Sequence, residues 1–173
     1  MPRHTISILV ENQFGVLARV VGLFAGRGFN IQCLTVNEEP LDPTVSKIVL
    51  VTAGPDEILE QINKQLNKLV PVIKVLDFQG VDTVEREMMM VKVAVDERNR
   101  AELDSIVTAF RAHVVDIGPR ALTVEITGDT EKLKAFVTLV RPFGIKEVVR
   151  TGSIAMARSV QLNGNQRQAR EEG

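Results

Sequence analysis

Aromatic residues are scarce in this chain of 173 residues, which has seven Phe and neither Trp nor Tyr. Single-stranded bases and sugars usually stack on Tyr or Trp, so the composition argues against proteins that bind them. An excess of positive charge is also lacking, because 21 Lys and Arg stand against 22 Asp and Glu. We therefore expect neither nucleic acid nor an anionic membrane as a partner.

Cysteine is nearly absent, and Cys33 alone can form neither an internal disulfide nor a Cys-based metal cluster. We expect Cys33 to be a small buried strand residue. We expect His4 and His113 to be structural, because no ligand residues surround them at metal-binding spacing, and no catalytic set emerges. The sequence also has no signal-peptide pattern and no apolar run as long as a membrane span, which predicts a cytoplasmic protein.

Two similar patterns of strands and helices fill most of the chain, and each has the order β-α-β-β-α-β of the ferredoxin-like arrangement. The sequence therefore predicts an α+β protein with two ferredoxin-like βαββαβ domains, at residues 1–79 and 80–158, and a polar tail at residues 159–173. Pro55 is expected to be the first residue of its helix. The expected strands are 4–10, 29–37, 46–52, 72–78, 88–95, 113–117, 121–128 and 145–152, and the expected helices are 16–24, 55–69, 103–110 and 133–140.

The strand at residues 46–52 is apolar on both faces, because Val49 and Val51 alternate with Ile48 and Leu50. The corresponding strand of the second half instead alternates apolar and polar residues, as in a sheet with one face in water. Something besides its own two helices must therefore cover the first sheet. A partner subunit is the simplest candidate, and the second domain is the other.

The loop between the first strand and the first helix is the most informative segment. A helix N-terminus presents unpaired N–H groups and a partial positive charge, so a small carboxylate can bind there without Lys or Arg. Asn12 offers both a donor and an acceptor, and Gly15 lets a ligand approach the backbone. Alternatively, Asn12 and Gly15 merely form a turn and a cap. Asn30, which opens the second strand, either faces such a site or satisfies local backbone groups.

The run ILVENQFGVLARVVGLFAGRGFNIQCLTV resembles the amino-terminal ACT domain of the small, regulatory subunit of acetohydroxyacid synthase, also called acetolactate synthase. The runs LEQINKQLNKLVPVIKV and VEREMMMVKV are similar to that family too, so the resemblance covers residues 3 to 158. It implies an N-terminal ACT domain and a second, ACT-like C-terminal domain. It also implies a non-catalytic subunit that activates the large catalytic subunit in branched-chain amino-acid biosynthesis and confers feedback inhibition by valine.

In such proteins two amino-terminal ACT domains pair in a homodimer, and the effector lies between them. By matching position, one chain would contribute Asn12, Gly15, Val16 and Leu17, and the other chain would contribute Asn30 and Ile31. The resemblance assigns thiamine diphosphate, Mg and FAD to the catalytic subunit and no cofactor to this chain.

Other functions remain to be weighed against this one. An independent enzyme would need a nucleophile, a base or metal ligands that the chain does not assemble. An RNA-binding module of the same fold class would carry aromatic residues on its central strands, which have none. Gly26 and Gly28 partly resemble a dinucleotide fingerprint, but they end a helix instead of starting one. An ACT domain that senses a different amino acid for a different enzyme stays open.

The connector between the two halves contains a charged run and a Met run. Glu85, Arg86 and Glu87 are expected to be solvated. Met88 to Met90 are expected to lie in a strand whose two faces are both partly buried.

Overall fold

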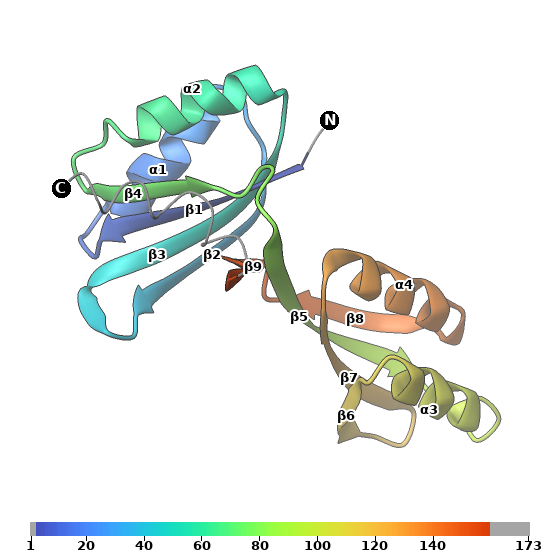
Figure 1. Cartoon of the computed structure of the whole chain (residues 1–173). Coiled ribbons are helices and arrows are strands. Elements are labelled where there is room, and N and C mark those ends of the chain that lie inside the picture. The colour runs from blue at the N-terminus through green and yellow to red at the C-terminus, as the bar shows by residue number, and fades with distance from the viewer. Residues whose placement is uncertain (1–2, 160–173) are drawn as a thin grey trace. The chain divides into compact units, whose positions relative to one another are not determined.

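The first sheet has four antiparallel strands in the order β2-β3-β1-β4, and two helices lie on one of its faces (Figure 1). The computed structural model describes residues 3–159 of the chain. The elements of this sheet and its helices are β1 (Arg3–Glu11), α1 (Val16–Ala25), β2 (Ile31–Glu39), β3 (Asp42–Ala53), α2 (Asp56–Leu66) and β4 (Val72–Asp77). This is the order that the sequence predicts.

The first core lies between this sheet and its helices. Apolar residues alternate along β1 and β3, so one set faces the helices, and residues three or four apart on each helix face the sheet. Each such side chain contributes roughly 1.5–3 kcal/mol when it is buried. This core fixes the position of α1 against the sheet. Its buried members are Ile6, Ile8, Val10, Val16, Val20, Phe24, Ile48, Leu50, Leu59, Ile62 and Leu66.

Helix α2 begins one residue later than the sequence predicts. Pro55 has an extended conformation, with φ −65° and ψ 145°, and serves as the N-cap, so the first helical residue is Asp56. Asp56 and Glu57 place negative charge in the first turn, where the helix dipole favours it.

The face of the first sheet that turns away from its helices is apolar at its centre, as the sequence indicates. Val49 and Val51 on β3 are only 5% and 1% exposed in the single chain. A partner subunit is therefore not needed to bury these two residues. On the other, helix-covered face, apolar side chains do remain exposed at the edge of the sheet, where Leu34 and Val36 of β2 pair with Leu50 and Ile48.

The second sheet has the strand order β6-β7-β5-β8, and α3 and α4 lie on one face of it (Figure 1). Its core contains the apolar residues that alternate along β5 and β7, together with Leu103, Phe136 and Val140 from the helices. Phe110 packs edge-on against Phe136, with ring centroids 5.5 Å apart. The elements are β5 (Thr83–Ala94), α3 (Arg100–Ala109), β6 (His113–Ile117), β7 (Ala121–Gly128), α4 (Thr130–Val140), a 3-10 helix η1 (Arg141–Phe143) and β8 (Ile145–Arg150).

The predicted fold class, α+β with two ferredoxin-like βαββαβ arrangements, is confirmed. The described chain forms one compact unit from residues 3–84 and 154–159, and a second from residues 85–153. A short strand that the sequence pattern did not predict, β9 (Ile154–Ala157), pairs with β5. The predicted boundary between residues 79 and 80 lies in the connection between β4 and β5, and most of the predicted tail lies outside the described residues.

Candidate functional site

The loop between β1 and α1 is held by backbone hydrogen bonds to two other segments. The N–H of Glu11 donates to the carbonyl of Pro71 (2.8 Å), and the N–H of Asn12 donates to the carbonyl of Thr44 (2.7 Å). The core beneath α1 fixes the other end of the loop. The loop therefore has a defined position beside the start of β3 and the start of β4.

Gly15 lies immediately before α1 and has a left-handed backbone conformation, with φ 80° and ψ −3°. Residues with a Cβ adopt this conformation at a cost. A Cβ placed on Gly15 would meet no atom within 4 Å, so the space beside it is open. The backbone conformation, and not crowding, therefore favours glycine here, and the open space leaves the backbone accessible to a ligand.

Helix α1 begins with no side-chain cap and with no acidic residue in its first turn. Among residues 3–159, no backbone carbonyl accepts a hydrogen bond from the N–H of Leu17 or Ala18. Such unpaired donors form the positive end of the helix dipole. The start of α1 can therefore accept a small carboxylate although no Lys or Arg lies between residues 4 and 18.

The Asn12 side chain is oriented by the hairpin that joins β2 to β3. Its Nδ2 donates to Oε1 of Glu38 (3.1 Å) and to the carbonyl of Pro43 (3.0 Å). These two acceptors fix which side of the amide carries the nitrogen. The amide oxygen then faces away from both acceptors and can accept a hydrogen bond from an ammonium group. Asn12 thus contacts the β2–β3 hairpin and does not cap α1 with its side chain, and it still offers an acceptor.

Asp42 stabilises the start of β3, the segment that binds the backbone and side chain of Asn12. The Asp42 carboxylate accepts hydrogen bonds from the hydroxyl (2.6 Å) and the N–H (3.0 Å) of Thr44. These bonds, the one from the hydroxyl foremost, lower the pKa of Asp42 below its ordinary value. The ionised carboxylate therefore supports Thr44, whose carbonyl accepts the N–H of Asn12.

Asn30 and Ile31 lie at the opposite end of α1. The carbonyl of Asn30 accepts a hydrogen bond from the hydroxyl of Thr52 (2.9 Å), and Ile31 pairs with Thr52 across the sheet. Helix α1 has ten residues and is therefore about 15 Å long. The structure thus does not bring Asn30 and Ile31 to Asn12 and Gly15 within one chain.

The apolar residues of the loop and of the first turn differ in exposure. Val16 is buried in the core, whereas Leu17 is exposed at the surface and Phe14 extends fully into solvent. Of the two residues that open α1, only Leu17 can therefore offer its side chain as an apolar wall.

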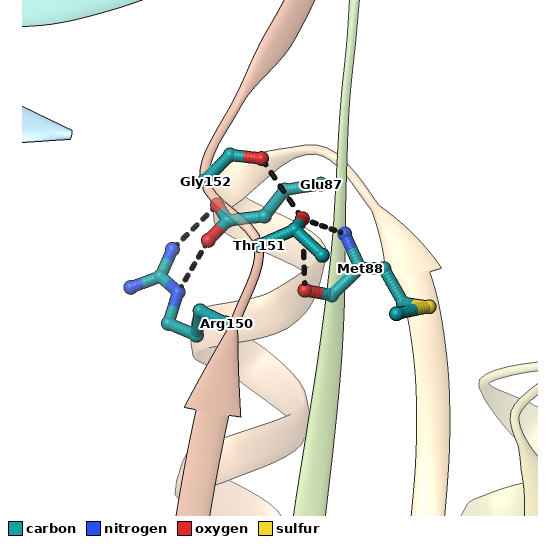
Figure 2. Close-up of polar contacts among 5 residues, drawn as sticks. All are labelled: Glu87, Met88, Arg150, Thr151 and Gly152. Carbon is teal, nitrogen blue, oxygen red and sulfur yellow. Dashed lines mark hydrogen bonds and ion pairs between the residues drawn. The ribbon is translucent and has the colours of Figure 1, made fainter. Parts of the chain in front are cut away.

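Glu87 is a residue that the sequence interpretation placed wrongly. It was expected to be solvated, but it is only 5% exposed. Nε and a terminal nitrogen of Arg150 donate to its two carboxylate oxygens, both at 2.6 Å (Figure 2). Glu87 has the same period-two phase on β5 as the buried residues Met89 and Val91, and this phase is the signal that predicts an inward-facing side chain.

Thr151 also links β5 and β8, the two strands that the Glu87–Arg150 pair joins. The N–H of Thr151 donates to the carbonyl of Met88 at 3.0 Å. The N–H of Met88 donates to the hydroxyl of Thr151 at 3.1 Å, and that hydroxyl has one proton to share between the carbonyls of Gly152 (3.0 Å) and Met88 (3.3 Å) (Figure 2). With the Glu87–Arg150 pair, these bonds fasten the middle of β5 to the end of β8.

Two other residues that the sequence singled out are His4 and Cys33. His4 is buried, and its Nε2 lies 3.2 Å from the carbonyl of Gly54, as expected for a structural histidine. Cys33 is partly exposed, so the expectation that it is buried is wrong. Within residues 3–159, no group of three or more His, Cys, Asp and Glu side chains is arranged to hold a metal ion. No helix in the same part of the chain is long and apolar enough to cross a membrane.

Comparison with protein families gives two matches that together cover most of the chain. Residues 6–74 match an AHAS small subunit-like ACT domain, and residues 86–159 match the small subunit of acetolactate synthase. The probable acetolactate synthase small subunit of Methanothermobacter thermautotrophicus is 53% identical over 156 residues, which cover 90% of this chain and 92% of that protein. The acetolactate synthase small subunit of Mycobacterium bovis is 43% identical over 155 residues, with 90% and 92% covered.

A solved structure agrees with these matches. The acetolactate synthase small subunit from Thermotoga maritima superposes with a TM-score of 0.82 at 39% identity, and the alignment covers 91% of this chain and 98% of that one. The fold and the first domain are thus those of an ACT-domain regulatory protein. The chain belongs to the acetolactate synthase small-subunit family, the non-catalytic regulatory subunits of an enzyme of branched-chain amino-acid biosynthesis, as the sequence resemblance indicated.

Proposed function

We propose that this chain activates a large catalytic subunit in the cytoplasm and makes it sensitive to valine, which binds between the N-terminal ACT domains of two copies. Thiamine diphosphate, Mg and FAD would belong to the large subunit. The effector differs in affinity for two arrangements of the assembly and thereby biases the catalytic subunit.

The observation that carries the proposal is the start of α1. Open space beside Gly15 and the unpaired N–H groups of Leu17 and Ala18 suit the carboxylate of an amino acid. The Asn12 amide oxygen suits the ammonium group, because both hydrogen-bond acceptors of its Nδ2 lie on the other side. Leu17 suits an aliphatic side chain.

The second copy is proposed because Asn30 and Ile31 lie about a helix length from this loop in their own chain. The edge strand β2 supports pairing, since it carries the exposed residues Leu34 and Val36. Exposed apolar residues on an edge strand favour association with another strand.

Calorimetric titration of the isolated protein with valine, leucine and isoleucine, repeated with the large subunit present, tests the proposal. We expect valine to bind at a stoichiometry of one or two molecules per pair of chains. We expect the isolated protein to form no acetolactate. Tight binding of an unrelated amino acid, without activation of the large subunit, would favour the alternative of an ACT-domain sensor for a different enzyme. Turnover by the isolated protein would exclude a purely regulatory role.

A further inference from the structure

A groove lies between helix α4 and the edge strand β8, entirely within residues 85–153. Its volume is about 370 Å³. Met89, Leu133, Val137 and Val148 give it an apolar lining. A space of this size is in the range of sites that bind a ligand or a side chain of a partner.

The groove exists because α4 does not cover the edge of the sheet. Within residues 3–159, β8 pairs with β5 alone. The register pairs Val148 with the buried residue Val91, so Val148 is on the helix-covered face, yet it is 42% exposed. The next residue, Val149, faces the other side and is also exposed. An edge strand with β-branched residues exposed on both faces is a template for an added strand.

The rim of the groove carries Lys134, Arg141 and Arg150. Two of these cations are already paired, Lys134 with Glu131 at 2.8 Å and Arg150 with Glu87 at 2.6 Å. In the described part of the chain, the Arg141 guanidinium forms no ion pair or hydrogen bond. The rim therefore has an uncompensated positive charge beside an apolar floor.

We propose that this groove docks an extended acidic segment of the large subunit. The segment would lie along β8 as an added strand, with an aliphatic side chain in the groove and an Asp or Glu paired with Arg141. A second copy of this chain fits less well, because two such rims would bring like charges together. The inference rests on the proposed function. It assigns the activating contact to a surface other than the effector loop, the loop between β1 and α1.

The test uses the full-length chain and its large subunit, with binding measured by calorimetry and activation measured by titration. Val148→Asp and Arg141→Glu are expected to raise the Kd for the large subunit at least tenfold and to leave valine binding to the isolated chain unchanged. Matched controls are Val115→Asp, on β6 at the opposite edge and 51% exposed, and Arg111→Glu, just before β6. Both controls are expected to stay within twofold of the wild type.

Salt dependence provides a second measurement that does not rely on the Val148 variant folding. The Kd of the wild type should rise with ionic strength more steeply than that of Arg141→Gln, because one ion pair is missing in the variant. Wild-type affinity in both groove variants, or equal losses in the controls, would overturn the docking inference and leave the proposed function intact. A wild-type chain that does not bind the large subunit would overturn both.

Discussion

At Gly15, the effects of backbone conformation and of charge on valine binding can be measured separately. Gly15→Asp is expected to weaken valine binding tenfold or more while activation survives, because it places a carboxylate where the effector carboxylate is proposed to bind. Gly15→Asn is the matched control, since Asn has the same size as Asp and tolerates the left-handed conformation about as well, without the charge. Calorimetry with valine measures the difference between them. Equal affinities of the two variants would remove the proposed carboxylate from this position.

Asp42 makes the stability of the segment that holds the β1–α1 loop depend on pH. Its folded pKa is lowered, foremost by the Thr44 hydroxyl, so its contribution to stability is fully present above the unfolded pKa of about 3.9 and is lost as pH falls through the folded pKa. Carboxyl NMR titration should place the midpoint below that of an ordinary Asp. Thr44→Val should move it upward, and Thr44→Ser, which keeps the hydroxyl, should not. A midpoint unaffected by Thr44→Val would mean that the hydroxyl is not the main cause.

Between strands β5 and β8, two ion pairs of different burial allow a matched comparison. Arg150→Ala leaves the Glu87 carboxylate buried without its bidentate partner, and we expect a loss of about 3 kcal/mol in the free energy of unfolding. Lys92→Ala removes the exposed pair with Glu147 across the same strands, which should cost less than about 1 kcal/mol. Denaturant unfolding of the full chain measures both. Equal losses would show that burial of Glu87 does not strengthen its dependence on Arg150.

The spacing of apolar residues predicted most helices and strands, because an element that buries one face must repeat its apolar residues with the period of that element. Helices α1 and α4 and strands β1 and β7 follow directly from apolar spacing, since each buries one face. Strand β9 and the early start of β5 at Thr83 were missed, because tertiary pairing and not local pattern forms them. The candidate loop was found from its position before α1. Its contacts with Glu38 and Pro43 depend on the β2–β3 hairpin folding back, and local sequence does not encode that approach.

On the scale of the whole molecule, two cores share no residue. Phe136→Ala is expected to destabilise residues 85–153 by roughly 3–5 kcal/mol, and Phe24→Ala to do the same to the first unit. Hydrogen exchange should show faster exchange in the unit that carries the substitution and little change in the other. Valine binding should survive Phe136→Ala and weaken in Phe24→Ala. Equal acceleration in both units for either variant would mean that they unfold as one.

The chain leaves the first unit between Val84 and Glu85 and returns between Ser153 and Ile154. The bonds of Met88 to Thr151 and of Glu87 to Arg150 join the segments that follow the first crossing and precede the second (Figure 2). Residues 85–153 therefore form a unit whose first and last residues are held near each other, the arrangement in which one domain can be exchanged for another.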